Sequence, residues 1–258
     1  MKEKYQIVEK ANYLNLLILI DELKAYDKNL SKLVEDKESW TDKLRNTRNV
    51  FISLNNLRDI MNKINLNISE EYIALNRDLK KKLAFANHFR NRAAGHLNET
   101  LLERAVQWSP QLFCKETKEN IDYKIAEAHR VIIESCINSY IDEKGIQKIF
   151  NTEIDLMYPA DFKLFFTYLQ ELIIESLEWL TISSNHILQS IEHHDETKIK
   201  ELAAVAAKTN FNLKEESEYN YPKEKQEEQL SMVLEELEKI NTEKEVIDFL
   251  KSRFQELK

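Results

Sequence analysis

Apolar residues recur at intervals of three and four along most of this chain, which is the period of a helix with one buried side. The segment from about Lys4 to Tyr26 carries two adjoining apolar stripes. These are formed by Ile7, Ala11, Leu14 and Ile18 and by Leu16, Leu19 and Leu23. So wide an apolar surface predicts a central helix that its neighbours cover well.

Short polar segments, some containing glycine or proline, interrupt the helical period. Ser69 is the expected N-cap of a helix that includes at least residues 72–89, because its hydroxyl can accept from an early backbone N–H. Asp161 is the expected cap of a later helix that extends towards residue 191. Further helices are predicted over about 30–64 with one break near 45–49, over 99–108, 121–142 and 198–208, and twice after a linker at 209–223.

The composition limits the fold class. Only two glycines and three prolines occur among 258 residues, whereas 32% of the residues are charged. Because many strands and hairpins would need more turn-forming residues, the chain is expected to be all-α. We expect a helical bundle over 1–143, additional packed helices over 144–209 and an acidic helical tail over 210–258. A capping box at Thr242 and Glu245 supports the last helix.

The cysteines and the apolar runs bear on the location of the protein. Cys114 and Cys136 have no close Cys or His partner at a metal-binding spacing, so free thiols in a reducing compartment are expected. The longest apolar run lies within residues 13–20 and falls short of the roughly 20 residues that cross a bilayer. We therefore expect a cytoplasmic protein without a membrane partner.

The charge is unevenly distributed. A net charge of -8 argues against a nucleic-acid partner, since phosphate contacts are made by Lys and Arg. However, residues 211–258 hold thirteen acidic and eight basic residues, whereas residues 77–97 hold six basic residues and one acidic residue. A locally basic segment thus lies within an acidic chain.

This basic segment leads into the stretch that carries candidate chemistry. Two arginines and two histidines surround Gly95 in the nine positions from His88 to His96. Arginine presents a fork of donors that matches phosphate oxygens, and histidine can exchange a proton near neutral pH. Together they indicate phosphodiester chemistry. Gly95 is expected to end or distort the helix, since glycine tolerates a positive φ.

Arg90 is followed directly by Asn91, and five residues separate Arg90 from His96. This pattern resembles the motif of the HEPN superfamily. The resemblance covers the motif and the helix order of residues 1–143. It implies a HEPN-type helical bundle, a homodimer and often a metal-independent endoribonuclease that needs no cofactor. Members commonly act as toxins or in defence against phage, so RNA and an antitoxin protein are the implied partners.

The resemblance implies that Arg90, Asn91 and His96 are catalytic. In the implied mechanism His96 is the base, Arg90 stabilises negative charge and Asn91 orients one of them. The predicted RNA-binding residues are Arg92, His88 and Lys82. In a regular helix Arg92 and His96 share a face, whereas Arg90 and His96 point about 120° apart. A break at Gly95 or a site shared by two subunits favours Arg90.

Other interpretations remain open. Arg90 and Arg92 could form ion pairs with Glu99 and Glu103, with His96 a simple helix-terminal residue. The protein would then be a non-catalytic helical interaction module or a nucleotide-binding module. Residues 192–196 are acidic residues and histidines, which are residue types that bind metals. Consecutive side chains at a helix end point in different directions and seldom converge on one ion, so no metal site is expected.

Overall fold

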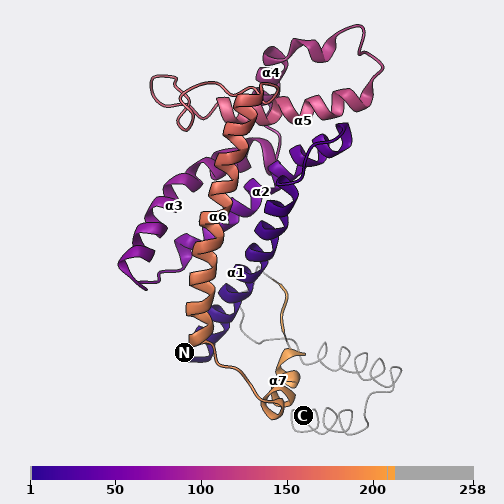
Figure 1. Ribbon diagram of the computed structural model, residues 1–258. Coiled ribbons are helices and arrows are strands. Elements are labelled where there is room, and N and C mark those ends of the chain that lie inside the picture. Colours follow the sequence, from indigo (N-terminus) through magenta and orange to yellow (C-terminus); the bar gives the residue numbers. More distant parts are fainter. Residues whose placement is uncertain (1, 208, 213–258) are drawn as a thin grey trace, which may run out of the picture. The chain divides into compact units, whose positions relative to one another are not determined.

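The computed structural model describes residues 2–207 and 209–212, and this part of the chain is helical (Figure 1). The prediction of an all-α fold is confirmed, because the only β-type pairing among the described residues is an isolated bridge between Ile141 and Gln147. The elements are α1 (Lys2–Leu30), α2 (Lys37–Lys63), α3 (Glu70–Phe89), a π-helical segment (Arg90–Ala94), α4 (Glu99–Trp108), a 3-10 turn (Pro110–Phe113), α5 (Ile121–Asn138), α6 (Pro159–Ser190) and α7 (Glu196–Ala206).

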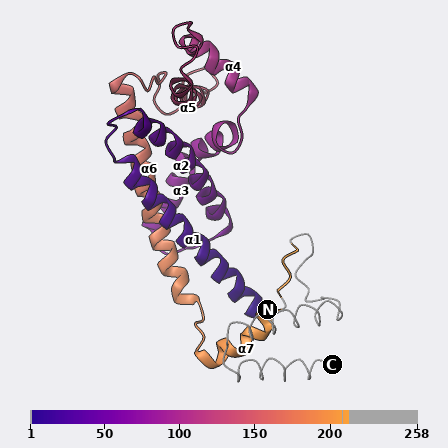
Figure 2. The ribbon, with the colours of Figure 1, turned by 90° about the vertical axis from the view of Figure 1, so that its right-hand side faces the viewer.

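Two compact units make up the chain, Met1–Ile191 and a second that begins at Glu192. In the first unit α1 packs against α2 and α6, and α2 also packs against α3 and α5. Figures 1 and 2 show α6 running beside α1, with α4 beside α5 at one end of these long helices. The sequence-based boundary after residue 143 falls inside this unit, because α6 follows that boundary and packs against α1 and α3.

Helix α1 is less covered than its two apolar stripes predict. Leu16, Leu19 and Leu23 are buried against the neighbouring helices. In contrast, 59% of Leu14 and 57% of Ile18 are exposed, so the expectation of a well-covered central helix is wrong. The physical reason is that, among the described helices, α2 and α6 make the main contacts with α1, and together they bury the stripe of Leu16, Leu19 and Leu23.

Helix α2 runs from Lys37 to Lys63 without the break predicted near residues 45–49. Asp36 caps its start, since the carboxylate accepts from the Ser39 N–H at 2.8 Å. Thr47, which lies in the segment predicted to break, is fully buried and donates its hydroxyl to the Lys43 carbonyl at 2.9 Å. Burial of one face thus keeps the polar sequence helical.

The predicted caps have different outcomes. Ser69 accepts from the Tyr72 N–H at 3.2 Å and caps α3, as predicted. Asp161 does not cap α6, because the helix begins earlier, with Tyr158 at the cap position and Pro159 at the first helical position. The fixed φ of proline suits the first helical position. The helices predicted after residue 223, with their capping box at Thr242, lie outside the described residues.

A buried ion network fixes the end of the molecule formed by α4 and α5. Arg130 is 2% exposed, and its Nη1 donates to both carboxylate oxygens of Glu134 at 2.7 Å. Its Nη2 donates to Glu127 at 2.6 Å. Glu134 also accepts from Trp108 Nε1 at 2.7 Å and from the Leu156 N–H at 2.8 Å. The network therefore joins α4, α5 and the loop before α6.

None of the described helices is both long and apolar enough to span a lipid bilayer.

Candidate functional site

The residues singled out in the sequence lie where α3 gives way to a wider helical turn. The Gly95 N–H donates to the Arg90 carbonyl at 2.8 Å, and the Asn98 N–H donates to the Arg92 carbonyl at 3.1 Å. These bonds span five and six residues instead of four, which widens the backbone over Arg90–Ala94. Phe89 and Ala93 are fully buried, while Arg90 and Arg92 are exposed. Short π-helical segments of this kind frequently occur at functional sites.

Packing against α2 holds the start of the widened turn. The ring of Phe89 stacks on Phe51 with a centroid separation of 3.9 Å and an interplanar angle of 14°. Phe85, one turn earlier, meets Phe51 edge-on at 5.3 Å. These aromatic contacts orient the last turn of α3, so that the arginines that follow face solvent.

Gly95 distorts the helix end for a reason different from the one predicted. Its φ is -75° and its ψ is -34°, so the helix is distorted as expected but without the positive φ that glycine tolerates. What glycine provides at this position is room for a close approach of Arg90. A Cβ atom there would lie 3.1 Å from the Arg90 carbonyl oxygen and 3.2 Å from Arg90 Nε. Glycine thus leaves room for the Arg90 side chain against the backbone of residue 95.

Arg48 of α2 supports the same turn, and the sequence analysis missed it. Its Nε donates to the Ala93 carbonyl at 2.7 Å. That carbonyl lies at the end of the helix, where no later N–H of the helix reaches it. Partial burial lowers the pKa of Arg48, and the charge of Arg48 adds to the burial that lowers the pKa of His129 on α5. The sequence has no local signal that pairs Arg48 with residues 45 positions later.

Asn91 lies between two polar side chains of the site. Its Oδ1 accepts from Arg90 Nη1 at 3.0 Å, and its Nδ2 donates to the Asn87 Oδ1 at 3.2 Å. The amide therefore ties the Arg90 guanidinium to the last turn of α3. This geometry is suited to the orienting role predicted for Asn91.

The arginines of the site are not neutralised by acidic neighbours in the described part of the chain. No carboxylate there lies within 4.0 Å of the guanidinium nitrogens of Arg48, Arg90 or Arg92. The ion pairs with Glu99 and Glu103 that would give a purely structural explanation are thus not formed. Three guanidinium groups with available N–H donors surround one turn.

His96 follows Gly95 in a bend and is exposed. No hydrogen-bond partner of its ring is found among the described residues, so both ring nitrogens face solvent or a ligand. The Arg90 side chain lies against Gly95, the residue that precedes His96 in the chain.

His88 has partners on α5. Its Nε2 lies 3.1 Å from the Cys136 carbonyl and 3.1 Å from Ser139 Oγ. Since a carbonyl accepts only from a protonated nitrogen, Nε2 carries the proton and cannot act as a base towards Ser139. Burial and the nearby Arg92 lower the pKa of His88 to about 4. The ring is therefore neutral at neutral pH and holds α3 on α5, which leaves its predicted RNA contact without geometric support.

Lys82 lies eight residues, or about 12 Å along the helix, before Arg90. Its Nζ forms a 2.5 Å ion pair with Glu175 Oε1 of α6. The side chain remains 44% exposed. Its predicted contact with RNA stays a prediction, and its observed contact links α3 to α6.

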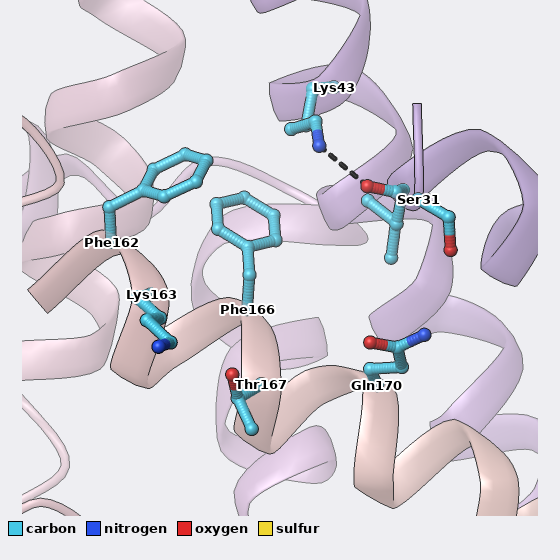
Figure 3. A pocket seen from close by; sticks show the side chains of 8 residues that line it. Ser31, Lys43, Phe162, Lys163, Phe166, Thr167 and Gln170 are labelled. Carbon is cyan, nitrogen blue, oxygen red and sulfur yellow. Dashed lines mark hydrogen bonds between the residues drawn. The ribbon is translucent and has the colours of Figure 1, made fainter. Parts of the chain in front are cut away.

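A separate cavity of about 220 Å³ lies between the end of α1 and the start of α6 (Figure 3). The nearly buried Lys43 donates to the Leu30 carbonyl at 2.5 Å, shown by the dashed line, and faces the Phe166 ring at 5.3 Å. Burial lowers the pKa of this lysine. Leu30 is the last residue of α1, so the ammonium caps the negative end of that helix, and a structural role explains its burial.

No group of three or more His, Cys, Asp or Glu side chains in the described part of the chain is arranged to hold a metal ion. No family model matches the sequence, and neither a curated protein nor a solved structure shows significant similarity to it.

Proposed function

We propose that the protein is a HEPN-like endoribonuclease that cleaves RNA without a metal ion, through a site composed of residues from two identical subunits. The observation that carries the proposal is the position of the Arg90 guanidinium against Gly95, one residue before the exposed His96. Arg48 and Arg92 add positive charge around the same turn. Such a cluster suits a phosphodiester, which carries one negative charge and gains another in the transition state.

The reaction needs a base, an acid and a cation. His96 takes the proton of the ribose 2′-hydroxyl as that oxygen attacks phosphorus, and the bond from phosphorus to the 5′-oxygen breaks. The partner's His96 donates a proton to the leaving 5′-oxygen. Arg90 binds the negative oxygens on phosphorus, and its bond to Asn91 keeps the guanidinium plane in place. The products are a 2′,3′-cyclic phosphate and a 5′-hydroxyl.

A two-fold axis supplies the second histidine, because an isologous interface brings identical patches together. The exposed stripe of α1, with Leu14 and Ile18, and the exposed Leu102 and Val106 of α4 provide apolar surface for such an association. The biological role that suits an RNA-cleaving homodimer of this kind is that of a cytoplasmic toxin or phage-defence effector, held in check by an antitoxin protein.

The experiment is RNA cleavage by purified protein in EDTA. His96→Ala should abolish cleavage, with helical circular dichroism unchanged. His186→Ala serves as the matched control, since His186 is an exposed histidine on α6, outside the site. Arg90→Lys should be severely impaired, because an ammonium cannot reproduce the planar fork, whereas Arg77→Lys on the same helix should cleave normally. Full activity of His96→Ala would refute the catalytic assignment.

The second candidate is a non-catalytic interaction module. The exposed apolar residues of α1 favour it, since contiguous apolar surface commonly marks a protein contact. Under this alternative, Ile18→Glu would disrupt association of the protein while His96→Ala would have no effect on any measured property.

A further inference from the structure

A cavity of about 420 Å³ opens between α4, α5 and the loop that precedes α6. Its walls include Arg104 and Trp108 from α4, Ser135 from α5, Ser139 at the end of that helix, and Glu153 from the loop. The volume lies in the range of small-molecule sites, roughly 300–1,000 Å³. It is large enough for a nucleobase with its ribose.

Ser135 marks the inner wall of this cavity. The residue is 7% exposed, and its hydroxyl has no hydrogen-bond partner in the described part of the chain. Buried hydroxyls are normally hydrogen-bonded, because leaving one unpaired costs free energy. A rotation about the Cα–Cβ bond presents this hydroxyl to a polar group that enters the cavity.

Trp108 provides a rigid aromatic surface at the same cavity. Its side chain is held by the Nε1–H bond to Glu134, a carboxylate that is fully buried and bound to Arg130. The residue is nevertheless 40% exposed. A fixed, accessible indole is the kind of platform on which a nucleobase stacks, since stacking loses little side-chain entropy when the ring is already held.

The walls of the cavity carry a positively charged side chain, Arg104, and a negatively charged one, Glu153. Arg104 donates one N–H to Gln107 Oε1 at 2.9 Å, which leaves its other N–H groups available. Glu153 is exposed and offers a carboxylate acceptor. Ring carbonyls accept from a guanidinium, and exocyclic amino groups donate to a carboxylate. A base with an exocyclic amino group can donate that group to Glu153, whereas uracil has no amino group to donate.

Ser139 and His88 connect the cavity to the arginine-rich turn. Ser139 lines the cavity, and its Oγ lies 3.1 Å from His88 Nε2. His88 in turn feels the charge of Arg92, which lowers its pKa. His88 lies four residues before Arg92, so Ser139 and His88 link the cavity wall to the turn that carries the proposed phosphate-binding arginines.

We propose that this cavity binds one base of a single-stranded RNA, stacked on Trp108, while the adjoining phosphates contact the arginines of the π-helical segment. The substrate class rests on the proposed function. The cavity gives the enzyme a preference for a base with an exocyclic amino group next to the cleaved bond.

The test uses the full chain and isothermal titration with AMP, CMP, GMP and UMP in EDTA. AMP, CMP and GMP should bind saturably and more tightly than UMP. Ser135→Ala should weaken their binding roughly fivefold to tenfold, which is the value of one hydrogen bond. It should not lower the melting temperature, because it removes an unsatisfied hydroxyl. Trp108→Leu should weaken binding by roughly tenfold or more.

The control is Ser176→Ala on α6, where the hydroxyl is fully buried but already donates to the Leu172 carbonyl at 2.6 Å. It should bind nucleotides as the unmodified protein does. His96→Ala should also bind them normally while failing to cut RNA. If nucleotides bind and the unmodified protein cuts no RNA, the cavity assignment stands and the nuclease assignment fails. If no nucleotide binds, or Ser135→Ala binds and cuts as before, the cavity assignment is overturned.

Discussion

Arg48 of α2 donates from its Nε to the carbonyl oxygen of Ala93 at 2.7 Å, and this contact ties the second helix to the turn that carries Arg90 and Arg92. The carbonyl belongs to a helix end that lacks further backbone donors. The guanidinium therefore takes the place of a helix cap, and it also adds positive charge beside the proposed phosphate site.

Replacement of Arg48 by Met should loosen this turn. Methionine fills similar space but leaves the Ala93 carbonyl without its donor, so stability should fall by about 1–3 kcal/mol. Amide hydrogen exchange at Gly95 and Asn98 should accelerate as the widened turn opens more often. Arg45→Met is the control, since Arg45 lies on the same helix, is exposed and forms a surface ion pair with Asp42. Equal stability of the Arg48 and Arg45 variants would contradict a capping role.

Replacement of Gly95 by Ala tests the close approach of Arg90. The backbone φ of -75° suits alanine, which favours a helix by about 1 kcal/mol over glycine. The close contact of the added Cβ with the Arg90 carbonyl oxygen opposes this gain, so stability should change little. The added Cβ would press on the Arg90 carbonyl and displace its guanidinium. RNA cleavage should therefore fall by about tenfold to a hundredfold.

The matched control is Gly145→Ala, at a φ of +80° in the loop after α5. It should cost about 1 kcal/mol of stability through backbone strain and leave cleavage unchanged. Undiminished cleavage by Gly95→Ala would show that the position of the Arg90 side chain does not matter.

The buried network around Arg130 should dominate the stability of the α4–α5 end. Arg130→Met leaves the Glu127 and Glu134 carboxylates buried without their counter-ion, so the free energy of unfolding should fall by about 3–5 kcal/mol. Urea unfolding measures this loss. Arg77→Met removes an exposed pair with Asp78 and should be silent. A small loss in Arg130→Met would mean that water enters and solvates the two carboxylates.

Much of the fold follows from the sequence because local signals agree with the packing. Helix α4 begins and ends where the pattern predicts, and the Ser69 cap is observed. The ion network was not predicted, because a helical period read from apolar residues treats Glu127, Arg130 and Glu134 as a solvent-facing stripe. Their spacing of three and four places them on one face, but only the tertiary structure shows that this face is buried.

The candidate site is only partly readable from the sequence. Arg90, Asn91 and His96 stand out by residue type, yet the widened turn depends on Arg48 and on Phe51, which are distant in the chain. His88 looks equivalent to His96 in the sequence. The structure separates them, since His88 packs on α5 and His96 faces solvent.

The environment of His88 predicts a pH dependence of stability. The pKa is lowered from 6.5 to about 4 in the folded protein, so the unfolded chain binds more protons between these values. The contribution of His88 to the free energy of unfolding should be constant above about pH 6.5 and should decline as the pH falls towards 4. The loss should reach at most about 3 kcal/mol. His88→Gln should show a correspondingly shallower decline in urea unfolding between pH 6.5 and 4, and an unchanged slope would contradict the shift.

The most direct test of the proposed chemistry is the structure of the RNA ends produced in EDTA. End-labelled RNA is incubated with purified protein, and the fragments are analysed by mass spectrometry. Fragments that end in a 2′,3′-cyclic phosphate and begin with a 5′-hydroxyl, and that disappear with His96→Ala but not with His186→Ala, are the predicted result. Intact RNA, or fragments that end in a 3′-hydroxyl, would contradict attack by the ribose oxygen assisted by His96 and Arg90.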